Sequence, residues 1–270
     1  MAIGQGDLWL FHRLKTQGFF PDPLAVAEIG AQQVNETILE NRADLAALGD
    51  AFGVRTPPPA LAPTKSKDRH LLAGAAMTRE IWQWLGVEYL AVDIDGSRDA
   101  IALDLNCDAV PAEARSKYGL VTNFGTTEHV ANQSNAFKII HDLTARGGIM
   151  VHNLPCHQPN HGLINYTTKF FWALARANGY RHIYARAHPE ADPESIHIAL
   201  QKQHDFEFVT PLDVDGTTTT DNDVMKQRYW TIFDKKAIDA ITSSHDAELI
   251  RRSIARRFPW LVPLKRRLFR

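Results

Sequence analysis

The stretch from residue 118 to residue 180 most constrains the fold, because it repeats one pattern of strand, polar loop and helix. The runs 120–122 and 149–151 are apolar, rich in β-branched residues and bounded by turn residues, which suits strands buried on both faces. Helix-like segments follow each run, near 133–145 and 167–178. Strands that alternate with helices predict an α/β fold built on a mainly parallel sheet.

Both of these predicted strands end in polar clusters that contain histidine and asparagine. In open α/β sheets, ligands bind outside the carboxyl ends of the strands. We therefore expect four histidines of the two loops to line a site: His129, His152, His157 and His161.

The same alternation extends through most of the chain. Further strands are predicted at 24–30, 87–93, 101–106, 181–186, 196–200 and 229–233. Further helices are predicted at 7–16, 36–48 and 68–85. Residues 53–67 contain four prolines and are predicted to form a loop, since proline blocks both helix and sheet pairing.

The bulk properties exclude several classes of protein. A length of 270 residues allows one large domain or two small ones, and a net charge of −1 gives the whole chain no preference for nucleic acid. Two cysteines are too few for a disulfide framework. The N-terminus lacks the pattern of a secretory signal, and no apolar run reaches the length of a membrane span. We expect a cytoplasmic protein.

Glu28 and Gly30 end the predicted strand at 24–30. A glycine after a buried strand lets backbone approach a ligand closely, and the start of a following helix favours polar or anionic groups. An ordinary turn between strand and helix explains the same residues. The complete glycine signature of dinucleotide-binding proteins is absent, because Gln32, Gln33 and Val34 follow.

Two acids stand at the tips of the next predicted strands. Asp93 follows a buried run directly and suits a ribose, because its carboxylate accepts hydrogen bonds from vicinal hydroxyls. Asp104, at the tip of the following strand, can accept from the exocyclic amine of adenine. A turn or a helix cap remains the alternative for Asp104.

The order of these motifs over residues 24–180 resembles the class I S-adenosylmethionine-dependent methyltransferases. The residues that carry the resemblance are Glu28, Gly30, Asp93, Asp104, Asn123, Glu128, His129, Gly147 and Gly148. It implies a Rossmann-like sheet of seven mostly parallel strands with helices on both faces. The run 229–233 fits the last, antiparallel strand of that fold.

The resemblance also implies a set of cofactor contacts. Glu28 and Gly30 would pass the methionine part, Asp93 would hold the ribose, and Asp104 with Leu105 would meet the adenine. The loop of Asn123, Phe124 and Gly125 would face the transferred methyl group. The chain departs from the family in keeping only Gly30 of the glycine-rich turn.

The resemblance divides the chain into three parts. Residues 24–240 would form the methyltransferase domain, with a helical lid inserted at about 50–86 between the first two strands. Residues 1–23 precede it as an N-terminal extension. Residues 241–270 follow as a basic amphipathic segment, which suits an anionic membrane surface or an acidic partner, or simply packs on the domain.

The histidines indicate the chemistry of the acceptor. Methyl transfer is an in-line displacement in which the enzyme mainly positions its reactants, and a hydroxyl acceptor gains from a general base. His129 is the first candidate for that base and His161 the second. The loop at 123–125 lacks the Pro-Pro-aromatic run of many amino-group methyltransferases, so we expect an oxygen acceptor on a small molecule, such as a sugar or another natural product.

Four residues are expected to contact that acceptor: Glu128, His152, Asn165 and Tyr166. The set His152, Cys156, His157 and His161 uses residue types that bind zinc, although Pro155 and Pro159 interrupt it, so the metal content is left open. A nucleotide-binding protein without catalytic activity is the alternative function.

Overall fold

A computed structural model describes residues 2–35, 38, 42–61, 76–95, 100–156, 158, 160–188 and 195–210. These residues form a seven-stranded sheet. From edge to edge its strands are β5 (Ala100–Ala102), β4 (Glu88–Asp93), β2 (Ala25–Ile29), β6 (Tyr118–Phe124), β7 (Thr144–Pro155), β9 (Ser195–Gln201) and β8 (Arg181–His188).

The strand directions confirm the predicted Rossmann-like sheet. The strands from β5 to β7 pair in parallel, whereas β9 is antiparallel to both β7 and β8. Among the described residues the antiparallel strand is β9. The run 229–233, predicted to be that strand, lies outside the described residues. Only six residues, 189–194, separate β8 from β9, and antiparallel neighbours need no longer connection.

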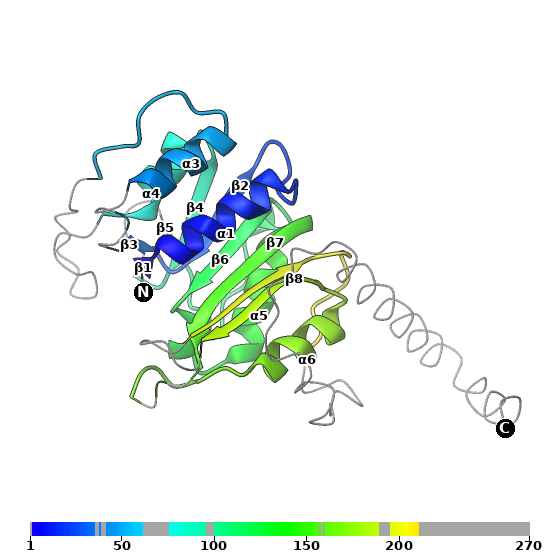
Figure 1. The fold of residues 1–270 in the computed structure, drawn as a ribbon. Coiled ribbons are helices and arrows are strands. Elements are labelled where there is room, and N and C mark those ends of the chain that lie inside the picture. The colour runs from blue at the N-terminus through cyan, green and yellow to red at the C-terminus, as the bar shows by residue number, and fades with distance from the viewer. Residues whose placement is uncertain are drawn as a thin grey trace, which may run out of the picture.

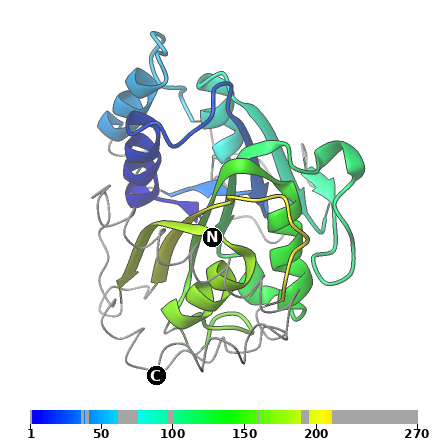
Figure 2. The same ribbon diagram turned by 90° about the vertical axis from the view of Figure 1, so that its right-hand side faces the viewer.

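Helices cover both faces of the sheet (Figures 1 and 2). One face carries α1 (Gln5–Thr16), α3 (Ala43–Ala51) and α4 (Thr78–Trp84). The other carries α5 (Gln133–Leu143) and α6 (Thr168–Asn178). Short elements complete the fold: β1 (Ala2–Ile3), which pairs with β3 (Gln33–Val34), and two 3-10 turns, η1 (Ala112–Ala114) and η2 (Thr127–His129).

The central strands are buried on both faces, as their apolar runs predicted. In β2, Val26 packs with the cluster under α1, while Ala27 packs with the cluster under α5. In β6, Leu120 and Val121 divide between the two clusters in the same way, and all four side chains are fully buried. Such strands carry no apolar–polar alternation, so their sequences do not show which face a side chain occupies.

The helix predicted at 7–16 is α1, and it belongs to the core. Phe11 is fully buried, with its ring 5.2 Å from that of Trp82 and 6.1 Å from that of Phe124. The buried Asp7 accepts a hydrogen bond from the side chain of Asn153 on β7 (3.3 Å) and lies 3.5 Å from His197 Nε2 on β9. The first turn of the helix is thereby anchored to two strands that come more than 130 positions later in the sequence.

The predicted lid at about 50–86 is only partly described. Its last helix, α4, ends before Gly86, which has the positive φ of 71° common after helices. Trp82 on α4 is 1% exposed and contributes to the core. Residues 62–75 lie outside the described residues, so the lid remains a prediction. The helix predicted at 36–48 is described as α3, which begins at Ala43.

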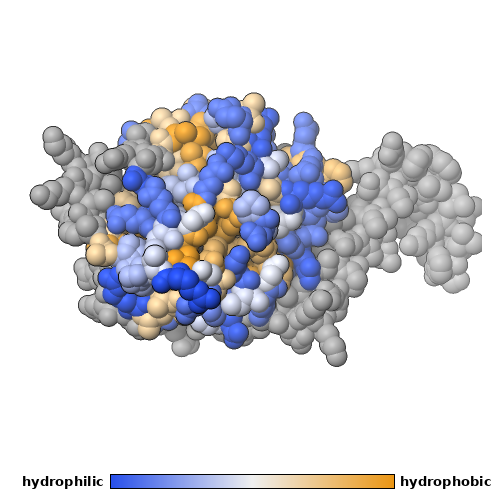
Figure 3. All heavy atoms as spheres, turned by 90° about the horizontal axis from the view of Figure 1, so that it is seen from above, coloured by the Kyte–Doolittle hydropathy of each residue, from blue (hydrophilic) through white to orange (hydrophobic). Residues whose placement is uncertain are grey.

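Among the described residues, no helix is both long and apolar enough to cross a membrane. Seen from above, hydrophobic residues reach the surface in limited areas among hydrophilic ones (Figure 3). Both cysteines are free, Cys107 exposed and Cys156 half-buried. The basic segment at 241–270 lies outside the described residues.

Because Phe11 fills the space between Trp82 and Phe124, Phe11→Ala should lower the free energy of unfolding by about 3–5 kcal/mol. The exposed Gln17, just after the same helix, supplies the control: Gln17→Ala should change it by less than about 0.5 kcal/mol. Urea denaturation followed by circular dichroism measures both. Equal effects of the two substitutions would contradict the assignment of α1 to the core.

Candidate active site

The tips of four neighbouring strands form the edge of the sheet where a ligand is expected. In the parallel register, Ile29 of β2 lies opposite Val92 of β4 and Asn123 of β6, and Asn123 lies opposite His152 of β7. The loops that follow these residues therefore leave the sheet side by side. Gly30, Asp93, Glu128 and His161 all belong to these loops or tips.

The turn after β2 requires glycine at position 30. Gly30 has a φ of 77°, and a Cβ atom there would lie 2.4 Å from Thr126 Oγ1. The Thr126 hydroxyl donates a hydrogen bond of 2.7 Å to the carbonyl of Ile29. The loop after β6 is thereby fastened against the turn after β2, and only a residue without a side chain fits between them.

Glu28, expected to contact the methionine part of a cofactor, is instead engaged within the protein. Its side chain is 1% exposed and accepts hydrogen bonds from four donors: Thr78 Oγ1 (2.6 Å), Tyr89 OH (2.8 Å), Trp82 Nε1 (2.9 Å) and the Gln32 backbone N–H (3.3 Å). Burial raises the pKa of Glu28 from 4.5 to about 7, against the opposing effect of these hydrogen bonds. Glu28 thus anchors α4 to β2.

Asp93 stands half-buried at the tip of β4, as predicted. One carboxylate oxygen accepts from the backbone N–H of Ala31 (2.9 Å), and the other accepts from that of Ile94 (2.8 Å). These two bonds orient the carboxylate over the Gly30 turn. Each carboxylate oxygen can accept more than one hydrogen bond, so Asp93 keeps capacity for the hydroxyls of a ligand.

Asp104 shapes the loop after β5. It accepts from the backbone and side-chain amides of Asn106, at 2.8 and 2.9 Å, and these bonds lower the pKa of Asp104. The Asn106 side chain in turn accepts from the backbone N–H groups of Ala131 and Asn132. Leu105 is 7% exposed and belongs to the core. The sequence reasoning missed Asn106, although an Asp-x-Asn turn signals such local bonding.

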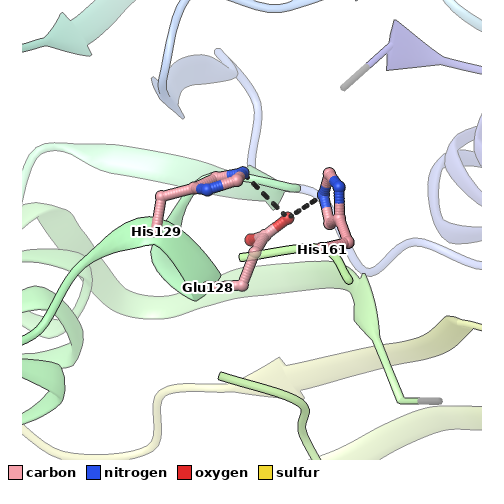
Figure 4. A group of neighbouring side chains, drawn as sticks. All are labelled: Glu128, His129 and His161. Carbon is pink, nitrogen blue, oxygen red and sulfur yellow. Dashed lines mark ion pairs between the residues drawn. The ribbon is translucent and has the colours of Figure 1, made fainter. Parts of the chain in front are cut away.

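The loops after β6 and β7 bring Glu128, His129 and His161 together (Figure 4). Glu128 is fully buried on η2, whereas the side chains of His129 and His161 are 53% and 40% exposed. Glu128 Oε1 lies 3.4 Å from His161 Nε2 and 3.9 Å from His129 Nε2. Both imidazole rings therefore point at the same carboxylate oxygen.

The backbone holds this cluster in place. The carbonyl of Glu128 accepts hydrogen bonds from the N–H groups of Leu163 (2.7 Å) and Ile164 (3.1 Å). Gly162, with a φ of 67°, packs so closely that a Cβ atom would lie 2.8 Å from Glu128 Cγ. His161 thus reaches Glu128 because its loop is pinned to the Glu128 backbone.

The electrostatics of the cluster are unusual for a buried acid. Neither carboxylate oxygen of Glu128 has a hydrogen-bond partner among the described residues, and 3.4 Å to His161 is longer than an ordinary N–H···O bond. Burial raises the pKa of Glu128, and the nearby His161 opposes that rise. Burial, followed by the charge of His161, lowers the pKa of His129, which favours a neutral imidazole at pH 7.

Asn123 and His152 lie beneath this edge, inside the core under α5 and α6. Asn123 is fully buried, with Nδ2 2.9 Å from Thr127 Oγ1 and 3.2 Å from His152 Nδ1. The His152 ring packs 5.5 Å from Phe137 and 5.1 Å from Phe171. Burial lowers the pKa of His152 to about 3. This placement gives His152 a packing role and separates it from the Glu128 cluster.

Tyr166 and Asn165 organise the loop that carries His161. The Tyr166 hydroxyl is hydrogen-bonded to Thr127 Oγ1 (2.9 Å) and Gln133 Oε1 (2.5 Å), and Tyr166 is 2% exposed. Asn165 uses both ends of its amide to bond the backbone of Gln158. The contributions of Thr127 and Gln133 had no signal in the sequence.

Of the other two residues predicted to contact the cofactor, one lies in the core and one in a turn. Phe124 is 1% exposed and stacks on Phe11. Gly125, with a φ of 69°, donates its N–H to Asn153.

The zinc-type set suggested by the sequence is not the one that the described residues bring together. The cluster consists of Glu128, His129 and His161; His152 is in the core, and His157 lies outside the described residues.

Comparison with models of known protein families gives no match, and comparison with curated proteins gives none. Solved structures of methyltransferases do match. The 1,6-didemethyltoxoflavin-N1-methyltransferase of Burkholderia thailandensis is 11% identical over 73% of this chain and 78% of its own, with a TM-score of 0.41. A methyltransferase from Archaeoglobus fulgidus is 11% identical over 72% and 93%, with a TM-score of 0.40.

A third match, a methyltransferase from Mesorhizobium loti, is 10% identical over 71% of this chain and 97% of its own, with a TM-score of 0.40. Likeness at this level carries no argument about activity. The fold assignment rests on the strand order and directions.

The raised pKa of Glu28 predicts a pH dependence of stability. Because the folded state binds this proton more tightly than the unfolded state, the free energy of unfolding should fall by about 3 kcal/mol as pH rises from 4.5 to 7. Glu28→Gln should remove that part of the slope, since it removes the titrating group. Urea denaturation at pH 5 and pH 7.5 measures it.

Glu88→Gln, on the exposed start of β4, is the control and should keep the wild-type slope. Glu28→Ala should lose about 2–4 kcal/mol at either pH, because it leaves buried donors unpaired. An unchanged slope in Glu28→Gln would contradict the assignment of this proton.

Proposed function

We propose that this protein is an S-adenosylmethionine-dependent methyltransferase that transfers the methyl group to a hydroxyl of a small molecule, such as a sugar or another natural product. The observation that carries the proposal is the Glu128–His129–His161 cluster, which lies on the loops after β6 and β7, beside the strand tips of Gly30 and Asp93. Group-transfer enzymes of this architecture need a cofactor site and an acceptor site side by side at that edge.

The strand tips fit the adenosine half of the cofactor. Asp93 is oriented by two backbone N–H groups and keeps acceptor capacity for the vicinal hydroxyls of a ribose. The loop shaped by Asp104 and Asn106 is the proposed contact for the adenine. Because residue 30 is a glycine with a positive φ, only backbone stands at the tip of β2, where the methionine half of the cofactor would pass. When bound, the sulfonium of the cofactor supplies an electrophilic methyl group.

The cluster supplies the means to remove the proton of an acceptor hydroxyl. His129 is the more exposed imidazole, and its lowered pKa favours the neutral form, which can accept a proton on Nε2. Glu128 Oε1, 3.9 Å from that nitrogen, stabilises the imidazolium that results. Without a bound cation, His129 is therefore the proposed general base, and His161 supports it from the other side of the carboxylate.

Nucleotide binding without catalysis is the alternative. In the turn after β2, the buried Gln32 side chain donates hydrogen bonds to the carbonyls of Ile29 and Gly30. This departure from a glycine-rich turn favours the alternative. That alternative gives no reason for a buried carboxylate whose two oxygens lack hydrogen-bond partners among the described residues, an arrangement that costs free energy in folding.

Asp93→Ala should weaken S-adenosylmethionine binding about 10- to 100-fold, because a carboxylate that accepts hydrogen bonds contributes about 1.5–3 kcal/mol. Titration calorimetry measures this, with Glu88→Gln at the opposite end of β4 as the control that should bind normally. Binding of a nicotinamide dinucleotide in place of S-adenosylmethionine would end the proposal.

His129→Ala should lower turnover about a hundredfold or more while leaving cofactor affinity nearly unchanged. The assay is release of S-adenosylhomocysteine with a panel of sugars and other polyhydroxylated natural products. His204→Ala is the control, because His204 follows β9 at the opposite edge of the sheet. Wild-type turnover in His129→Ala at neutral pH would exclude this imidazole from the reaction.

A further inference from the structure

We propose that Glu128, His129 and His161 bind one divalent transition-metal ion, and that the acceptor hydroxyl coordinates the same ion. This inference rests on the proposed function and specifies how the acceptor is held. It concerns the cluster of Figure 4, in which one carboxylate oxygen and two imidazole nitrogens converge.

The spacing of the three side chains suits a metal better than a hydrogen bond. Their ligand atoms all lie within 4.8 Å of one another, and the carboxylate oxygen is 3.4 and 3.9 Å from the two Nε2 atoms. Ligands about 2.0–2.1 Å from a tetrahedral ion lie about 3.3–3.5 Å apart. His161 Nε2 is already at that separation from the carboxylate oxygen. A small rotation of the His129 side chain would bring its Nε2 to the same distance.

Charge and burial point to a cation. Glu128 is fully buried, and its ion pairs within the described residues are to His129 and His161, neither of which is a permanent cation. Within the described parts of the chain, both of its oxygens lack hydrogen-bond partners, as does His161 Nε2. A buried carboxylate that lacks hydrogen bonds is unfavourable, and a divalent ion would satisfy the carboxylate and both nitrogens at once.

The types of the three ligands indicate which class of ion binds, and their exposure indicates that one coordination position is open. One carboxylate and two imidazoles form the protein ligands of catalytic zinc in one group of hydrolases and of non-haem iron(II) in oxygenases. Magnesium and calcium prefer oxygen ligands, so they fit two imidazoles poorly. Because both histidine side chains are about half exposed, one side of the site faces solvent and can admit the acceptor oxygen.

The loop around the cluster is already set for binding. The two backbone N–H groups of Leu163 and Ile164 hold the Glu128 carbonyl, and Gly162 fits against the Glu128 side chain. Such support around the ligands fixes their orientation before the ion arrives.

Coordination would change how the acceptor loses its proton. A hydroxyl bound to the ion has a lower pKa, so its O–H bond breaks and water carries the proton away. The resulting alkoxide forms the O–CH₃ bond while the S–CH₃ bond breaks, which leaves S-adenosylhomocysteine, the methyl ether and one proton. In this state His129 is a ligand and not the base.

The experiment is zinc titration of the full-length protein after chelation and dialysis, by calorimetry, repeated with cobalt(II), whose visible absorption reports its coordination geometry. The wild type should bind one ion per chain at this site. Glu128→Gln and His161→Ala should each weaken that binding about a hundredfold or more, since even loss of a supporting contact costs 10- to 100-fold.

The matched control is Glu113→Gln on the exposed turn η1, which should bind like the wild type. Zinc affinity that is the same in the wild type and in both cluster variants would overturn the proposal. Glu128→Gln removes a buried charge and should fold; His161→Ala changes a half-exposed side chain, so the test holds even if the first variant does not fold.

S-adenosylmethionine binding is measured on the same chelated protein. If the cofactor binds but the cluster takes no ion, the metal proposal fails and the proposed function stands with His129 as base. If the cofactor does not bind with or without metal, the proposed function fails, whatever the zinc titration shows.

Discussion

The hydrogen bond from the Thr126 hydroxyl to the carbonyl of Ile29 determines how the two halves of the site meet. It ties the loop after β6 to the tip of β2, and the absent side chain of Gly30 makes room for it. Asp93 is bonded to the same turn through Ala31, and Glu128 follows Thr126 by two residues. The proposed cofactor and acceptor sites therefore share one rigid junction, as reactions that depend on positioning require.

Two buried glutamates, Glu28 and Glu128, differ in how their burial is compensated. Glu28 accepts hydrogen bonds from four donors on α4, β4 and the turn after β2, so its burial is compensated. Glu128 is equally buried, yet among the described residues neither of its oxygens has a hydrogen-bond donor. Native proteins rarely leave a buried carboxylate in that condition without a ligand or a reaction that uses it.

The sheet could be predicted because its signals are local: apolar runs, turn residues and helix stops such as Gly86 and Gly179. The antiparallel direction of β9 could not, since strand pairing is decided by contacts distant in sequence. The convergence of Glu128, His129 and His161 followed from the parallel strand order. The buried positions of Glu28 and His152 could not be predicted, because the sequence of a strand buried on both faces does not show which helices will cover each side chain.

The anchoring of α1 has a consequence for synthesis of the chain. Asp7 finds Asn153 146 positions later, and His197 later still. At about 5–20 residues per second, these partners leave the ribosome on the order of ten to forty seconds after the helix does. During that interval the apolar side of α1, with Leu8, Phe11 and Leu14, has an incomplete surface to pack on. Helix α1 is thus made well before the strands that hold its first turn, so its docking is completed only after β9 has been synthesised.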